Sequence, residues 1–101
     1  MSEVNVFKLA SSEEIICTVV DEQPDYFVVE KCRAVGPQEH ENGQLSLQWM
    51  PFIWSDVEGN ATVDLYKTSI MGRLKTIPKN MEDEYVSKTS GIVIAGAGDL
   101  K

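Results

Sequence analysis

A segment free of acidic residues carries four basic side chains in the last third of this chain. Residues 65–81 contain no Asp or Glu, and we call them the basic segment. Its basic side chains are Lys67, Arg73, Lys75 and Lys79. The whole chain has 9 Lys and Arg against 16 Asp and Glu, a net charge of −7. Because binding follows the local electrostatic potential, a basic segment on an acidic protein can still contact a phosphate chain. The alternative, that these side chains only solvate a small domain, stays open at this stage.

Residue types that serve in catalysis are few and scattered. The single histidine, His40, stands between Glu39 and Glu41 in a polar loop, and neither cysteine has a histidine near it in the sequence. Two cysteines and one histidine do not give a zinc-binding spacing. We therefore predict a protein that is not an enzyme and that holds no metal and no cofactor.

The two cysteines, Cys17 and Cys32, also bear on the compartment. If the strand-like runs that contain them form a hairpin centred near Gln23, the residue opposite Cys17 is Val29, so we expect no disulfide with Cys32. The 101 residues leave room for one domain, and they show no signal peptide, no apolar run of transmembrane length and no cysteine framework. We predict a cytoplasmic protein with no membrane partner.

Alternation of apolar and polar residues with a period of two dominates the chain and predicts strands. The six runs that show it are 4–9, 14–21, 26–35, 44–54, 61–67 and 70–77. Gly36-Pro37 is expected to end the third run, and Asn42-Gly43 predicts a hairpin turn before the fourth. Pro51 places the fourth run at a sheet edge or a bulge. The pattern predicts a mainly β fold, a small and strongly bent antiparallel barrel of five or six strands.

The period changes near the C-terminus, where a short helix is expected near residues 80–90. Pro78 and the candidate N-cap Asn80 precede apolar residues at helical spacing, with acidic residues in the first turn and Gly91 after the end. The apolar run 92–94 is expected to be a strand that pairs with the sheet or with a neighbouring subunit. We predict one domain over 1–94 and a flexible tail over 95–101.

Short pieces of sequence spread over nearly the whole chain carry a resemblance to a known family. They are the run 8–16, Trp49-Met50-Pro51-Phe52, Ser69-Ile70, Pro78, Tyr85 and Ser90-Gly91-Ile92-Val93. In this order and spacing they resemble a family of small Sm-like proteins from tailed phages. The resemblance implies a five-stranded barrel of the Sm type whose members close into homo-oligomeric rings by pairing edge strands of neighbouring subunits.

The wider Sm class binds single-stranded RNA by stacking bases on an aromatic side chain and holding them with polar and basic groups from two loops. The place of the first Sm motif holds Asp25-Tyr26, without the family's Asn, and the second aligns best with Tyr66 and Lys67 in place of its Arg-Gly. A competing alignment of the second motif uses residues 70–73. The resemblance implies nucleic-acid contact through Tyr26, Tyr66, Lys67, Arg73 and Lys75. For Tyr26 the alternative of a half-buried strand tyrosine stays open.

An apolar run around Pro51 supports a second hypothesis. Its residues Trp49, Met50, Phe52 and Trp54 suit the barrel core, a subunit interface or a site for a partner protein. We thus predict a ring-forming Sm-like protein that binds single-stranded RNA or DNA in phage nucleic-acid processing. The alternative is a non-enzymatic structural or adaptor ring that binds a phage or host protein.

Overall fold

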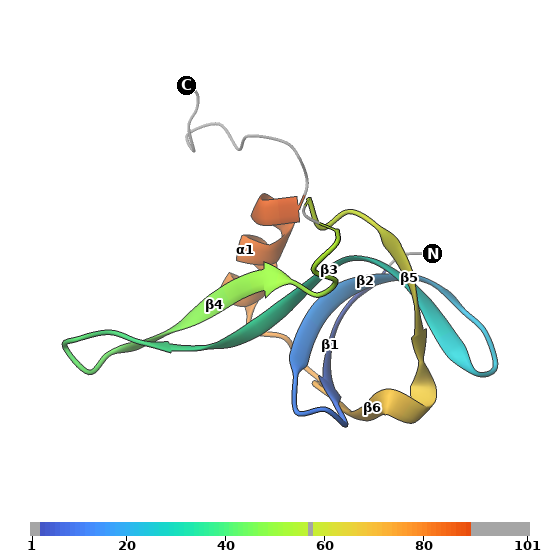
Figure 1. Cartoon of the computed structure of the whole chain (residues 1–101), viewed down its shortest axis with the longest axis horizontal. Helices are drawn as coiled ribbons and strands as arrows, with labels where there is room; N and C mark the ends of the chain where they lie inside the picture. The colour runs from blue at the N-terminus through green and yellow to red at the C-terminus, as the bar shows by residue number, and fades with distance from the viewer. Residues whose placement is uncertain (1–2, 57, 90–101) are drawn as a thin grey trace.

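The protein was analysed as a computed structural model, which describes residues 3–56 and 58–89. These residues form a mainly antiparallel β fold with six strands and one short helix near the C-terminus (Figure 1), as the sequence predicts. The elements are β1 (Glu3–Leu9), β2 (Glu14–Glu22), β3 (Tyr26–Glu39), β4 (Leu45–Pro51), β5 (Thr62–Tyr66), the 3₁₀ turn η1 (Lys67–Ser69), β6 (Ile70–Arg73) and α1 (Lys79–Thr89). The predicted strand at 92–94, Gly91 and the tail 95–101 lie outside the described residues.

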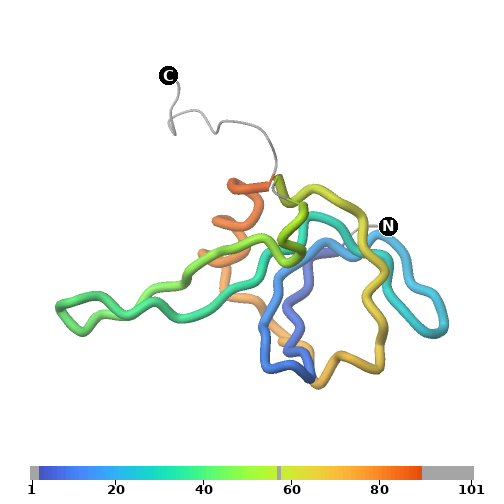
Figure 2. Tube along the Cα trace, in the orientation of Figure 1, coloured from blue at the N-terminus to red at the C-terminus, as the bar shows by residue number. Residues whose placement is uncertain are grey.

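The strands form one bent sheet in the order β4-β3-β2-β1-β6, with β5 paired to β3. All pairs are antiparallel. Because β5 lies on β3 and β6 lies on β1, the short turn η1 that joins β5 to β6 closes the sheet on itself (Figure 2). This arrangement is compatible with a small, strongly bent barrel of the Sm type.

Besides its pairing with β2, strand β3 pairs with two different strands along its length. Residues 26–30 pair with β5 in the barrel, whereas residues 33–39 pair with β4. Lys31, between these two parts, has a φ of 57°, and the register of β2 against β3 shifts at the same place. A residue in the left-handed region bends a strand, and across this bend β3 changes its partner from β5 to β4 while residues 33–35 stay paired with β2. Residues 33–51 form a two-stranded arm with β4, which projects from the barrel beyond Val35, where the pairing of β3 with β2 ends (Figure 1).

The predicted end of the third strand at Gly36-Pro37 is wrong, because β3 continues to Glu39. Proline lacks an N–H and is excluded from strands with neighbours on both sides, but it is tolerated at an edge. Beyond Val35, β3 has β4 on one side and no described strand on the other, so Pro37 can pair with Leu47. Strand β4 ends at Pro51 as an edge strand, which confirms that prediction.

The predicted register of Cys17 is also wrong. Val29 pairs with Val19, and the register shifts place Cys17 between the pairs Ile16–Arg33 and Thr18–Glu30. Cys17 therefore faces the part of β3 that contains Cys32. Both thiols are buried and free, which confirms the expected absence of a disulfide between them.

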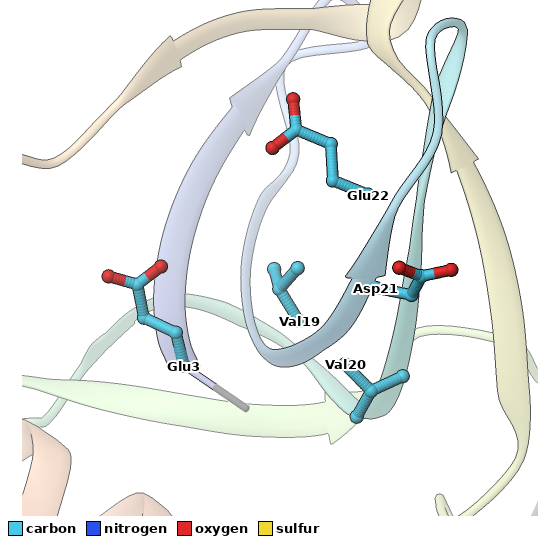
Figure 3. Close-up of a pocket in the computed structure, with 5 residues that line it drawn as sticks. All are labelled: Glu3, Val19, Val20, Asp21 and Glu22. Carbon is cyan, nitrogen blue, oxygen red and sulfur yellow. The ribbon is translucent and has the colours of Figure 1, made fainter. Parts of the chain in front are cut away.

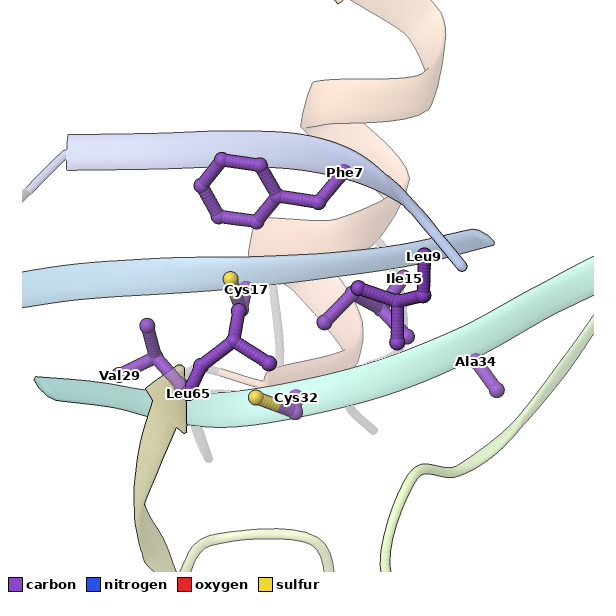
Figure 4. Close-up of a cluster of buried hydrophobic side chains, with 8 residues drawn as sticks. All are labelled: Phe7, Leu9, Ile15, Cys17, Val29, Cys32, Ala34 and Leu65. Carbon is purple, nitrogen blue, oxygen red and sulfur yellow. The ribbon is translucent and has the colours of Figure 1, made fainter. Parts of the chain in front are cut away.

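Two hydrophobic clusters lie on opposite faces of the bent sheet. The cluster inside the barrel consists of Phe7, Leu9, Ile15, Cys17, Val29, Cys32, Ala34 and Leu65 (Figure 4). On the outer face, Tyr85 of α1 packs against Val6, Ile16 and Val35. Neighbouring residues of β2 point to opposite faces, and because α1 covers the outer one, Ile15 and Ile16 both have no exposed surface.

Tyr85 fixes the helix to the bend in β3. Its side chain is 1% exposed, and its hydroxyl donates a hydrogen bond to the Lys31 carbonyl at 3.0 Å. The same oxygen lies 2.7 Å from Thr18 Oγ1 on β2. Helix α1 begins at Lys79, one residue before the predicted cap, and the Asn80 side chain accepts a hydrogen bond from the Met81 N–H at 3.0 Å. The helix thus holds β2 and β3 together at the bend where β3 changes its partner from β5 to β4.

The buried position of Tyr85 predicts a loss of stability in alkaline solution. Burial raises the pKa of Tyr85 to about 12 from its ordinary value of 10.0. Above about pH 10 the unfolded chain loses this proton, while the folded protein retains it. The contribution of Tyr85 to the free energy of unfolding is therefore fully present below about pH 10 and is lost as the pH rises towards about 12. Urea unfolding across this range measures the effect. A Tyr85→Phe variant should show a shallower decline, and an unchanged decline would contradict the assignment.

Candidate nucleic-acid interface

Tyr26 and Tyr66 form an aromatic pair at one rim of the barrel. Tyr26 is the first residue of β3 and Tyr66 the last of β5, and because these strands are antiparallel the two residues lie directly opposite each other. Their ring centres are 5.4 Å apart with the planes inclined by 60°. Tyr66 is 54% exposed, whereas Tyr26 is half-buried. The pair presents one open aromatic surface on which a base or another flat group can stack.

Lys67 lies beside this pair, but its charge is balanced locally. Its ammonium is 2.7 Å from Glu22 Oε2 and 4.9 Å from the centre of the Phe27 ring. Its backbone N–H donates to the Asp25 carbonyl at 2.9 Å, which ties η1 to the β2–β3 turn. The Glu22 carboxylate repels a phosphate, so this ion pair weakens the attraction of Lys67 for a phosphate group.

Arg73 and Lys75 belong to a different part of the surface. Arg73 ends β6 and pairs in register with Phe7 of β1, and Lys75 is exposed just beyond the strand. Arg73 lines a hollow of about 310 Å³ together with Lys8, a residue that sequence analysis did not select. Only strand pairing brings Lys8 to this place, so no sequence signal could have found it.

The basic segment therefore does not form one continuous patch. Lys67 pairs with Glu22, and Lys79 lies 3.5 Å from Asp83 one helical turn away. Arg73 and Lys75 make no ion pair among the described residues. The structure brings Tyr26, Tyr66 and Lys67 together, and the contacts of Arg73 lie with β1 instead.

Carboxylates surround another hollow, of about 280 Å³, near the end of β2. Glu3, Asp21 and Glu22 line it together with two valines, and the three carboxylates point in different directions (Figure 3). Within residues 3–56 and 58–89 no cluster of His, Cys, Asp and Glu side chains is suited to hold a metal ion. This acidic surface is unfavourable for phosphate groups.

Cysteine and histidine are residue types that nucleophilic catalysis uses, and the contacts of Cys17, Cys32 and His40 account for these residues without a catalytic role. The hydrogen bond between the two thiols, together with burial, raises the pKa of Cys17 well above its ordinary value, so the reactive thiolate is disfavoured. His40 Nε2 lies 2.8 Å from Ser46 Oγ across the exposed turn of the arm. In the described part of the chain no side chain hydrogen-bonds to the other ring nitrogen of His40 to orient it, as a Ser–His site requires.

A second exposed surface lies on the arm and the loop that follows it. Leu45 and Leu47 of β4 are exposed, and Trp54 is 74% exposed, whereas Trp49 packs against the outer cluster and Phe52 against the barrel cluster. The apolar run that sequence analysis singled out is thus divided between the two clusters and the surface.

The loop after β4 is held in place by polar contacts. The Asp56 carboxylate accepts hydrogen bonds from the N–H groups of Gly59 and Ala61 at 3.1 and 2.9 Å. The Arg33 guanidinium donates to the carbonyls of Gly59 and Glu58. The loop that presents Trp54 is therefore anchored to β3 at the base of the arm.

No helix among residues 3–56 and 58–89 has the length and apolar character needed to cross a membrane. Comparisons with protein-family models, with curated proteins and with solved structures find no match to this chain. The fold and the site define a small, strongly bent antiparallel β barrel with an exposed aromatic pair at one rim.

Proposed function

We propose that the protein is a ring-forming, Sm-like binding protein that contacts single-stranded nucleic acid, RNA or DNA, through Tyr26 and Tyr66. The observation that carries the proposal is the aromatic pair itself, since Tyr66 is exposed and has its partner ring 5.4 Å away. Stacking on an aromatic side chain is worth about 1–3 kcal/mol per base and is tolerant of sequence. Tyr66 is thus the main stacking residue, and Tyr26 supports its ring.

Charge plays the smaller part in this proposal. Lys67 is paired with Glu22, so Arg73 and Lys75 are the cations left for the phosphate backbone. Contact with the backbone then depends on the number of subunits, because a symmetric ring repeats the same cations on every copy. We expect a modest affinity that decreases with salt.

Free strand edges at the two ends of the sheet path support the proposed ring. The path of the sheet begins at β4 and ends at β6, so in the part of the chain that the structure describes each of these strands has one edge without a partner. Pairing the free edge of β4 with that of β6 in the next copy is a head-to-tail contact, and such contacts give a ring when the rotation between copies closes and a filament when it does not. Light scattering should give a mass that is a fixed multiple of 11.3 kDa, and a strict monomer would overturn the ring.

Replacing Tyr66 by alanine should weaken binding to single strands about tenfold, since the loss of one stacked base costs on the order of 1–3 kcal/mol. Fluorescence anisotropy with labelled oligo-uridine, oligo-adenosine and single-stranded DNA, at low and high salt, measures the effect. The matched control is Tyr66→Phe, which keeps the ring and should keep the affinity. Equal binding by the alanine and phenylalanine variants would remove Tyr66 from the interface.

The exposed apolar side chains of the arm favour a second candidate function, a non-enzymatic adaptor that binds a phage or host protein. Leu45 and Trp54 are 70% and 74% exposed, and Trp54 stands on an anchored loop. Exposed tryptophans on rigid supports are frequent anchors of protein interfaces. If no oligonucleotide binds even at low salt, the adaptor function is the one that remains.

A further inference from the structure

A groove lies where the arm leaves the barrel, between β3 and the turn that joins β1 to β2. Its volume is about 470 Å³. Its lining has an apolar part, residues 34–37 of β3 with Leu47 and Met50 of β4, which we call the floor, and a polar part, Lys8 and residues 12–14, which we call the rim. Sites that take one apolar side chain and fix its orientation with a few polar groups have this composition.

The backbone of β3 is available along this groove. The pairing of β2 with β3 ends at Glu14 and Val35, and β4 occupies the opposite edge of β3. On the side facing the groove, residues 36–39 have no described strand beside them. An unpaired strand edge can receive an extended peptide as an additional strand, although Pro37 has no N–H to donate, so the other backbone groups of residues 36–39 would carry the pairing.

Gly36 keeps the groove open, although the fold does not require a glycine there. Its φ is not positive, unlike those of Gly43 and Gly59, so any residue could adopt its backbone conformation. A Cβ built on Gly36 would meet no atom within 4 Å. Glycine within a strand costs about 0.5–1 kcal/mol relative to alanine, and it often marks a site where another backbone approaches closely.

The rim of the groove has an excess of negative charge. Lys8 lies 3.6 Å from Glu14 and also donates a hydrogen bond to the Ser12 carbonyl at 3.0 Å. Glu13 accepts a hydrogen bond from the Ser11 hydroxyl at 3.1 Å and forms no ion pair among the described residues. One lysine thus faces two carboxylates, which favours a basic ligand.

From these observations we propose that the groove binds an extended basic peptide of another protein, added to the free edge of β3. An apolar side chain of the peptide rests on the floor at Gly36, and a neighbouring Lys or Arg faces Glu13 and Glu14. The site differs from the Tyr26–Tyr66 pair, and it leaves the free edge of β4 open. The proposed peptide binding therefore does not depend on whether the protein binds nucleic acid.

The test is fluorescence anisotropy with a labelled peptide in which lysine and valine alternate, against a peptide in which glutamate replaces lysine. The lysine peptide should bind to the full chain and the glutamate peptide should not. Gly36→Leu fills the groove and should weaken binding at least tenfold. The matched control is Thr62→Leu, which adds a leucine at an exposed position of β5 that lines neither this groove nor the hollow beside Arg73.

A second variant, Glu13→Gln with Glu14→Gln, tests the charge separately and should also weaken binding of the lysine peptide. The proposal is overturned if Gly36→Leu binds as well as Thr62→Leu, if both peptides bind equally, or if oligo-uridine displaces the lysine peptide. Competition by oligo-uridine would assign the groove to nucleic acid. Loss of oligonucleotide binding in Tyr66→Ala, with peptide binding unchanged, would separate the two sites.

Discussion

Replacement of Tyr85 by alanine is expected to lower the free energy of unfolding by about 3–5 kcal/mol, the usual cost of removing a buried aromatic ring. The ring fills the contact between α1 and the outer face of the sheet, and its hydroxyl satisfies the Lys31 carbonyl at the bend in β3. Domains of this size are stable by about 5–15 kcal/mol, so the variant should be near the limit of folding. Urea unfolding followed by circular dichroism measures the change.

Two further variants separate packing from hydrogen bonding at this residue. Tyr85→Phe keeps the ring but leaves the Lys31 carbonyl and the Thr18 hydroxyl without this partner, which costs about 1–3 kcal/mol. Val86→Ala changes the next residue of the same helix, which is 46% exposed, and should alter stability by less than about 1 kcal/mol. A Tyr85→Ala variant as stable as Val86→Ala would refute the proposed role of the helix.

Gly59→Ala is the second substitution with a large expected effect, a destabilisation of about 2–4 kcal/mol from backbone strain and lost hydrogen bonds. Gly59 has a φ of 75°, which an L-residue adopts at a cost. An added Cβ would also collide with the Arg33 guanidinium, which holds the carbonyls of Gly59 and Glu58. The loop that carries Trp54 should lose its anchor, which urea unfolding and tryptophan fluorescence together detect.

The matched control for this prediction is Gly36→Ala. Gly36 has an ordinary φ and free space around its Cα, so alanine there should be neutral or should stabilise the fold by about 0.4–1 kcal/mol. If both alanine variants have the same stability, then neither the left-handed backbone nor the Arg33 contacts stabilise the loop.

Much of this fold is predictable from local pattern, because burial on one face of a strand leaves a period of two in the sequence. The runs at β1 and β2 and the Asn42-Gly43 turn each have a counterpart in the structure, where Gly43 has a φ of 85°, but residues 5–7 and 15–17 are buried on both faces of the sheet, which alternation alone does not predict. The continuation of β3 past Pro37 was not predictable in this way. It depends on the absence of a neighbouring strand at one edge, which is a property of the whole sheet.

The candidate site, too, was only partly predictable from the sequence, because its contacts join distant parts of the chain. Tyr26 and Tyr66 were selected as separate residues, but their direct contact follows from the pairing of β3 with β5. The ion pair of Lys67 with Glu22 joins positions far apart in the sequence, so a count of charges along the basic segment could not reveal it. A pattern of charges in the sequence identifies side chains that could bind a phosphate. Only the fold determines which of these side chains already form ion pairs within the protein.

The division of β3 between barrel and arm sets an order for folding. The arm is a hairpin of neighbouring residues and can form within about 1–10 μs, whereas the barrel closes only when β6 reaches β1 and β5 reaches β3 across most of the described chain. Contacts between distant segments form late, because ordering the intervening chain costs entropy. We therefore expect the Tyr26–Tyr66 pair to form late in folding, so a chain whose barrel has not closed should lack the aromatic pair.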